Sequence, residues 1–264
     1  MITTTTEDKV RFITMCNPRH LNALSNELCD ELIDAIEKAY QKECACIVLQ
    51  AECRNGVWSA GHDIRELPLD GSDPLAYDVA LERLLRAVQN VPIPVIASIT
   101  GSVWGGACDL TLSCDMIVAA DTASFAITPA KIGIPYNSSG LMHFINQLGI
   151  NKAREMFFTA QPISAQEALN VGLINHVAPM DELPSVLNEK MLAPIRRNSI
   201  MAISAIKRQF RILTSGLSHV SAENLELISM MRKRAYQSTD YREGVTSFIE
   251  KRQPVYTGKA QDLS

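Results

Sequence analysis

No stretch of the sequence stays apolar over the about 18 residues that a membrane-spanning helix needs. Two apolar runs, 91–99 and 110–120, are interrupted by Pro92 and Pro94 and by Asp115, respectively. The first residues also lack the basic and apolar regions of a signal peptide. We therefore expect a cytoplasmic protein with no membrane partner.

The chain also lacks blocks of like charge. It has 25 Lys and Arg residues against 29 Asp and Glu residues, which gives a net charge of −4. Nucleic-acid surfaces usually carry clustered basic residues, so we expect no nucleic-acid partner. With 47% hydrophobic residues over 264 positions, the chain can bury a full core, which excludes a disordered protein.

Cysteine motifs are absent as well, because neither a CxxC nor an HExxH pattern occurs. The seven cysteines are an odd number and all lie within the first 114 residues. This arrangement is not typical of a disulfide framework. We expect free structural thiols and no bound metal.

What the sequence does contain is an alternation of strand and helix patterns. Apolar, β-branched runs of strand length occur at 10–16, 44–50, 94–99 and 116–120. Apolar residues at helical spacing follow Ser25 and fill 75–90. Such alternation predicts an α/β fold.

After residue 137 the pattern becomes mostly helical. Helices are predicted at 137–149, 164–172, 181–192, 194–215, 221–237 and 240–252. We find no internal repeat and no long linker. We therefore expect a core domain at 1–195 and a helical C-terminal region at 196–264, whose amphipathic helices suit subunit packing.

Two small-residue turns carry the chemical signal. The glycine turn at 101–109 is not a phosphate loop, since Ala107 and Cys108 stand where Lys and Ser or Thr are required. It lies between a strand and a predicted helix, whose first N–H groups lack intrahelical partners. A second turn, at 58–64, also follows a strand. Two such turns could each contribute one N–H to an oxyanion hole, which a thioester enolate needs.

These turns, Ser59-Ala-Gly-His-Asp63 and Gly101-Ser-Val-Trp-Gly-Gly-Ala107, occur after Leu21-Asn-Ala-Leu24. Together they resemble the crotonase (enoyl-CoA hydratase/isomerase) superfamily over about residues 8–254. Further segments fall in the family's order, namely 113–115, Phe125, 132–135 and 168–175.

The resemblance implies a spiral of repeated ββα units whose C-terminal helices join subunits into homotrimers, often paired as hexamers. It implies oxyanion donors at the backbone N–H groups of His62 and Gly106. The acyl-CoA contacts that it implies, with basic residues for the CoA phosphates at the two ends, are Arg19, Leu21, Ala23, Leu24, Ala60, His62, Asp63, Ile64, Gly105, Gly106 and Lys251.

Departures from the hydratase pattern narrow the expected reaction. Hydratases of the family use two glutamates, and their positions hold Asp109 and Pro129 here. The segments 59–68 and 128–137 are instead similar to the branch of the family that decarboxylates methylmalonyl-CoA. In that branch Tyr136 faces the acyl group, where its phenol can donate a hydrogen bond without adding a negative charge.

The expected reaction is therefore the decarboxylation of methylmalonyl-CoA to propionyl-CoA through a thioester enolate. Coenzyme A is part of the substrate, and no separate cofactor is expected. Besides Tyr136, the candidate catalytic residues are His62, Gly106, Thr128 and Asp109. The other histidines lack a partner pattern and are expected to be structural or surface residues, namely His20, His143, His176 and His219.

Two alternatives remain open at this point. An enoyl-CoA hydratase, isomerase or acyl-CoA thioester hydrolase of the same superfamily would use Asp109 as its working acid. A non-catalytic relative would bind acyl-CoA or RNA, although the net negative charge weighs against RNA.

Overall fold

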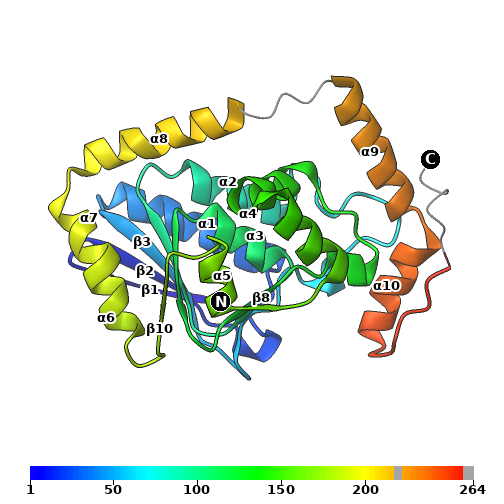
Figure 1. The fold of residues 1–264 in the computed structure, drawn as a ribbon, viewed down its shortest axis with the longest axis horizontal. Helices are drawn as coiled ribbons and strands as arrows, with labels where there is room; N and C mark the ends of the chain where they lie inside the picture. The colour runs from blue at the N-terminus through cyan, green and yellow to red at the C-terminus, as the bar shows by residue number, and fades with distance from the viewer. Residues whose placement is uncertain (217–221, 258–264) are drawn as a thin grey trace.

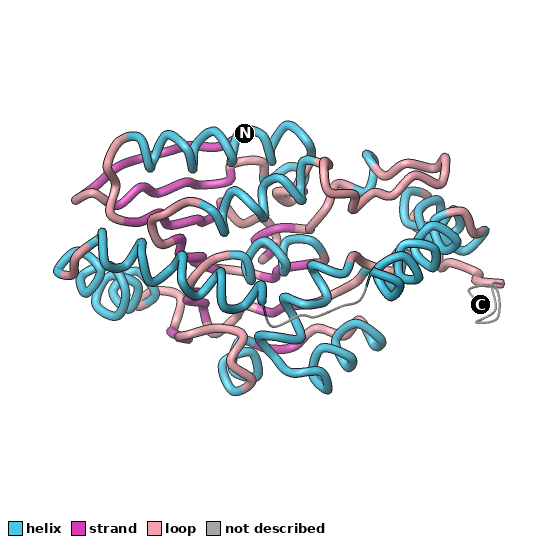
Figure 2. The backbone as a smooth tube through the Cα atoms, turned by 90° about the horizontal axis from the view of Figure 1, so that it is seen from above, coloured by secondary structure: helices cyan, strands magenta, loops and turns pink. Residues whose placement is uncertain are grey.

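The computed structural model describes residues 1–216 and 222–257, and it contains two β-sheets surrounded by helices. Figure 2 shows the strands lying between layers of helices. The α/β prediction is therefore confirmed. Among the described residues, no helix has the length and hydropathy that a membrane crossing requires.

The larger sheet has six strands in the order β1-β2-β3-β5-β7-β10. Only β1 runs antiparallel to its neighbour. Most of its central residues are buried on both faces, which explains their continuous apolar runs. The strands are β1 (Ile2–Glu7), β2 (Val10–Met15), β3 (Cys46–Ala51), β5 (Val95–Ile99), β7 (Met116–Ala120) and β10 (His176–Ala178).

The smaller sheet has four short strands in the order β4-β6-β8-β9. These are β4 (Val57–Ser59), β6 (Ser102–Trp104), β8 (Ser124–Ala126) and β9 (Ile163–Ser164). Each of β3, β5 and β7 is followed by a strand of the smaller sheet and then by a helix. The repeated ββα unit implied by the family resemblance is thus present, although the sequence shows no visible repeat.

Helices cover the large sheet and form the core with it. Ser25 caps the first of them by accepting a hydrogen bond from the Leu28 N–H at 3.3 Å. The helices of this layer are α1 (Asn26–Gln41), α2 (Ala80–Asn90), α3 (Gly106–Ser113), α4 (Ser138–Thr159) and α5 (Ala165–Asn170). Their apolar faces join one buried cluster with the strands.

Several helix boundaries differ from the sequence prediction. Helix α2 begins at Ala80 rather than at 75, because the Asp73 carboxylate accepts from the Leu75 N–H and holds a turn there. Helix α4 is interrupted at Gly149, whose φ of 73° and ψ of 159° are not helical, so the predicted end at 149 coincides with a kink, after which a second helical segment runs to Thr159. Residues 183–197 form one helical stretch through α6 (Leu183–Leu187), the π-helical turn η4 (Asn188–Leu192) and α7 (Ala193–Arg197). Extended backbone at Asn198 then ends it.

The C-terminal helices are α8 (Ile200–Gly216), α9 (Ala222–Tyr236) and α10 (Thr239–Ile249). Figure 1 shows α8 running along one side of the core, with α9 and α10 at the end opposite α6 and α7. Large apolar side chains on these helices are exposed, among them Met201, Phe210 and Leu213. The described residues also include three 3₁₀ turns, which are η1 (Pro18–His20), η2 (Ile64–Glu66) and η3 (Pro129–Ile132).

Candidate active site

The two small-residue turns meet at the ends of β4 and β6. A Cβ atom at Gly61 would lie 2.3 Å from the Trp104 carbonyl oxygen and 3.1 Å from the Gly106 nitrogen. A Cβ atom at Gly106 would lie 3.5 Å from the His62 nitrogen. Only glycine permits this approach, and Gly61 also has a φ of +84°. The N–H groups of His62 and Gly106 are therefore neighbours.

Both N–H groups are free to bind a ligand oxygen. Neither donates a hydrogen bond to any group in residues 1–216 and 222–257. Gly106 is the first residue of α3, so its N–H is also at the positive end of the helix dipole. Gly105, with a φ of +52°, sets the direction in which this helix starts. Two neighbouring N–H groups without partners are what an oxyanion hole requires, and this role of the pair stays a prediction.

The first predicted acyl-CoA segment packs directly against the first turn. The Ala60 N–H donates to the Leu21 carbonyl at 2.9 Å, and the Leu24 N–H donates to the Gly61 carbonyl at 2.7 Å. The buried Asn22 reinforces the contact, because its amide donates to the Trp58 carbonyl at 3.0 Å. The structure thus brings 21–24 and 60–63 together.

The imidazole of His62 has an unusual environment. Its Nδ1 atom is buried and has no hydrogen-bond partner among the described residues. Burial lowers the pKa of this imidazole, and the nearby Asp63 carboxylate offsets only part of that effect. A neutral, buried and unpartnered ring nitrogen is a candidate contact for a bound ligand.

Thr128 also lies at the second turn, because its Oγ1 atom would be 3.4 Å from a Cβ atom at Gly105. It precedes η3, in which Pro129 occupies the position of the second hydratase acid. The structure therefore places Thr128 beside the predicted oxyanion hole, and it places no carboxylate at position 129.

Tyr136 and Asp109 form a buried pair one helical turn beyond Gly106. The Tyr136 hydroxyl donates to Asp109 Oδ2 at 3.0 Å, and the Asp109 side chain is only 1% exposed. Burial raises the pKa of the phenol well above its usual value, and the adjacent Asp109 charge adds to this effect. Tyr136 therefore keeps its proton. It also has a φ of 58°, a strained value for a non-glycine residue.

A second carboxyl group lies near this pair. The buried Glu82 of α2 accepts a hydrogen bond from the Asn137 amide. Asn137 in turn caps α4, accepting from the Gly140 N–H at 2.7 Å. Burial raises the pKa of Glu82, and the Asp109 charge raises it further. Sequence reasoning missed Glu82, whose position on an amphipathic helix gives no local sign of burial.

His143, for which the sequence shows no partner pattern, has two hydrogen-bond partners in the structure. Its Nδ1 atom lies 2.7 Å from Asp109 Oδ1, and its Nε2 atom lies 2.9 Å from the Gln89 amide nitrogen. The partners come from three different helices, so no sequence spacing could reveal them. His20 contacts Asn17 Oδ1 at 3.1 Å. His219 lies outside the described residues.

The two predicted CoA-phosphate residues lie on the surface. Arg19 is exposed in η1, and Lys251 is exposed beyond the end of α10. Helix α10 itself packs over the elements that flank the site, since the Tyr241 hydroxyl donates to the Pro68 carbonyl at 2.8 Å. The roles of Arg19 and Lys251 remain predictions.

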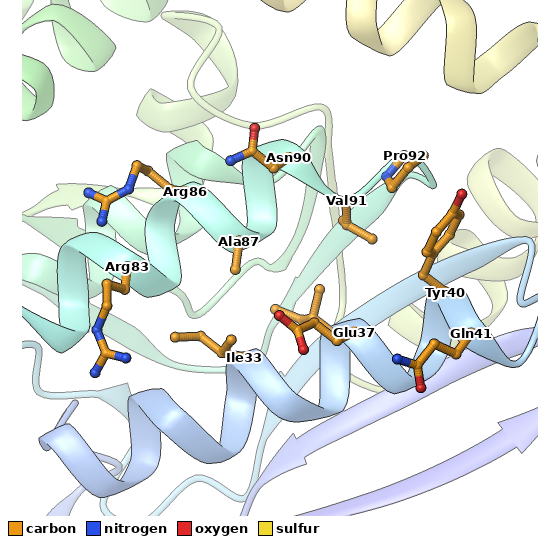
Figure 3. A pocket seen from close by; sticks show the side chains of 11 residues that line it. Ile33, Glu37, Tyr40, Gln41, Arg83, Arg86, Ala87, Asn90, Val91 and Pro92 are labelled. Carbon is orange, nitrogen blue, oxygen red and sulfur yellow. The ribbon is translucent and has the colours of Figure 1, made fainter. Parts of the chain in front are cut away.

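Two surface pockets of about 480 Å³ each are lined by none of the predicted site residues. Figure 3 shows the one between α1 and α2, into which Arg83 and Arg86 could offer positive charge. Arg83 is already paired with Asp30 at 2.8 Å, and Arg86 stacks 3.6 Å over the Tyr77 ring. The paired N–H groups, rather than a surface pocket, therefore mark the candidate site.

No group of three or more metal-ligating side chains occurs in the described part of the chain.

A family model described as enoyl-CoA hydratase/isomerase matches residues 5–259. Methylmalonyl-CoA decarboxylase of Escherichia coli strain K12 is 41% identical over 254 residues, which are 96% of each chain. A probable enoyl-CoA hydratase of Rhodobacter capsulatus is 31% identical over 251 residues, 94% of each chain.

The chain is also similar to solved structures of methylmalonyl-CoA decarboxylases. A methylmalonyl-CoA decarboxylase in complex with 2-nitronate-propionyl-CoA matches with a TM-score of 0.94 at 40% identity, over 98% of each chain. A second, complexed with 2S-carboxypropyl CoA, also matches with a TM-score of 0.94 at 40% identity over 98% of each chain.

Proposed function

The chain belongs to the enoyl-CoA hydratase/isomerase family, and we propose that it is a carboxy-lyase that converts methylmalonyl-CoA into propionyl-CoA and CO2. The observation that carries this proposal is the pair of unpartnered N–H groups at His62 and Gly106. A tyrosine, Tyr136, is hydrogen-bonded to Asp109 of the helix that begins at Gly106. The 41% identity to the Escherichia coli decarboxylase supports the same reaction.

The oxyanion hole supplies the main stabilisation. When the bond between Cα and the carboxylate breaks, its electron pair enters the thioester and places negative charge on the thioester oxygen. The N–H groups of His62 and Gly106 donate hydrogen bonds to that oxygen, and the start of α3 adds a favourable dipole. The thioester itself accepts the electrons, so we propose that no separate cofactor takes part.

Three side chains orient the substrate carboxylate in this proposal. The Tyr136 phenol, the Thr128 hydroxyl and the unpartnered His62 Nδ1 can each form a hydrogen bond with it. They hold the carboxylate out of the thioester plane, so that the breaking bond overlaps the carbonyl system. None of them adds a negative charge that would repel the substrate.

Binding of the CoA portion uses the backbone of two segments. The 21–24 and 60–64 segments, already paired with each other, contact the acyl-CoA, and Gly105 leaves room for it at the second turn. Arg19 and Lys251 are proposed to contact the CoA phosphates. Both are exposed, as a residue that reaches for a phosphate must be.

The hydratase alternative is less well supported by the site. Asp109 is hydrogen-bonded to Tyr136 and to His143. Position 129 holds a proline, so no second acid is there to activate water together with Asp109. A thioester hydrolase or an isomerase would also lack a second acid at position 129. A non-catalytic role in binding acyl-CoA or RNA would leave the paired N–H groups without a chemical task.

The decisive experiment offers the purified protein methylmalonyl-CoA and crotonyl-CoA in parallel. CO2 release and propionyl-CoA formation are followed for the first, and loss of enoyl-thioester absorbance for the second. We expect CO2 release without hydration. Hydration of crotonyl-CoA with no CO2 from methylmalonyl-CoA would replace the proposal with the hydratase alternative.

We also propose a cytoplasmic homotrimer, or a hexamer of paired trimers, assembled through the C-terminal helices. The exposed apolar side chains of these helices support it, since Phe210 is 65% and Met201 84% exposed in the single chain. We retain 1–195 and 196–264 as the proposed division, with its boundary inside α7.

A further inference from the structure

A chain of hydrogen bonds leads from the buried Tyr136 toward the surface. The phenol donates to Asp109 at 3.0 Å, and Asp109 contacts His143 Nδ1 at 2.7 Å. His143 Nε2 meets the Gln89 amide at 2.9 Å, and that amide also donates to Ser113 Oγ at 3.2 Å. The side chain of Asp109 is 1% exposed and that of His143 is 26% exposed, whereas Ser113 is buried. The chain therefore reaches solvent at His143.

The direction of the first hydrogen bond creates a conflict with substrate binding. A phenol has one hydrogen, and here it points to Asp109. Toward a substrate carboxylate, Tyr136 would then present only lone pairs, which repel an anion. Tyr136 can turn its hydrogen to the substrate only if Asp109 becomes the donor to the phenol oxygen, and for that Asp109 must hold a proton.

We propose that Asp109 and His143 together hold the proton that decarboxylation consumes and deliver it through Tyr136 to the enolate. This inference rests on the proposed function, because it assumes a malonyl-type substrate. Asp109 and His143 act through Tyr136, and they are therefore positioning residues.

The proton balance is complete. In the free enzyme the extra proton of the pair rests on His143, because Tyr136 donates to the Asp109 carboxylate. When the substrate carboxylate binds, this proton moves from His143 to Asp109, so that Asp109 donates to the phenol and the phenol to the substrate. CO2 leaves, and the electron pair of the broken bond enters the enolate. Cα then takes the proton of Tyr136, and the phenolate recovers one from Asp109, which leaves an ionised Asp109 beside a neutral imidazole. Water protonates the partly exposed imidazole, which restores the starting state.

Gln89 suits both protonation states of His143. With its amide nitrogen toward Nε2, as in the structure, it donates to a neutral imidazole and to Ser113. Turned over, its carbonyl oxygen accepts from a protonated imidazole and from the Ser113 hydroxyl. Neither state leaves a buried polar atom unpaired.

The charges around His143 favour the protonated form. Burial lowers the pKa of its imidazole, but the hydrogen bond and the charge of Asp109 outweigh burial, and the charge of Glu82 adds to them. The net result is a raised pKa. Arg86 on α2 acts on Glu82, and Tyr136 shares Asp109 with the imidazole. The pair therefore keeps its proton above the usual imidazole pKa of about 6.5 and loses it as the pH rises further.

The test is the pH profile of kcat for CO2 release, measured for the wild type and three variants. In the wild type we expect kcat to fall as the pH rises through the raised pKa of His143. His143→Gln keeps a donor toward Asp109 but cannot titrate, so its pH profile should lose this descending limb. Its kcat at low pH should fall at least 10-fold. Gln89→Glu places a negative charge beside the imidazole, so the limb should move to higher pH.

His176→Gln, on β10, is the matched control and should keep the wild-type profile. Thermal unfolding and KM are measured alongside, so that a folding defect is recognised. A wild-type limb that persists unchanged in both His143→Gln and Gln89→Glu overturns the relay while leaving the decarboxylase proposal intact. A wild type that releases no CO2 overturns the proposed function instead.

Discussion

Gly140→Ala tests the buried site through one added methyl group. Gly140 lies in the first turn of α4, and a Cβ atom there would be 2.3 Å from Tyr136 Cε1 and 2.7 Å from Asp109 Oδ2. It would also be 2.8 Å from the Asn137 oxygen that caps the helix. Because Tyr136 packs against Phe157 with ring centroids 5.2 Å apart, the ring has little room to retreat.

Helix propensity favours the alanine variant, whereas packing and hydrogen bonding oppose it, and the sum decides whether the free energy of unfolding rises or falls. Alanine in place of a helical glycine stabilises by about 1 kcal/mol. Overpacking costs about 1–3 kcal/mol, and a disturbed hydrogen bond to the Asp109 carboxylate costs about 1.5–3 kcal/mol. We therefore expect the free energy of unfolding to fall by about 2 kcal/mol or more. Turnover should fall about 10- to 100-fold if that bond positions the phenol.

The assay combines denaturant unfolding with CO2 release from methylmalonyl-CoA. Gly149→Ala, in the same helix, is the control, because its Cβ atom would meet nothing within 4 Å and only the φ of +73° opposes it. The control should lose stability but keep kcat once folded. A Gly140→Ala protein that is more stable than the wild type and equally active would refute the packing argument and the placement of Tyr136.

Further predictions follow from the same site and its supports. Tyr136→Phe keeps the buried ring but removes the hydroxyl, so the CO2 release rate should fall about 10- to 10³-fold while propionyl-CoA binding, by calorimetry, hardly changes. Gly106→Pro deletes an oxyanion donor and should lower kcat by about 10² or more, with circular dichroism checking the fold. Lys207→Met should lower the free energy of unfolding by about 3 kcal/mol in denaturant titrations, because the Lys207 ammonium contacts Asp115 at 2.7 Å and two backbone carbonyls. Light scattering at micromolar concentration should find an oligomer, and a monomer would contradict the role given to the C-terminal helices.

The sequence by itself determined the local features of this protein. Apolar β-branched runs predicted the strands β2, β3, β5 and β7 of the large sheet, because strands buried on both faces need such residues, but they did not predict β1 and β10. Ser25, Asn137 and Ser164 marked helix starts, and each caps its helix in the structure. The two small-residue turns predicted one N–H donor each, and in the structure the N–H groups of His62 and Gly106 are neighbours.

Only the tertiary structure decided which distant side chains share the buried site. Asp109 and His143 are separated by 34 positions and lie on different helices, and Glu82 reaches Asn137 from a third. No periodicity links such residues, since their contact depends on how helices pack over the sheet. The repeated ββα unit was hidden for a similar reason. Its strands are only three residues long in the smaller sheet, too short to show a pattern, and hydrogen bonds between strands far apart in the chain define them.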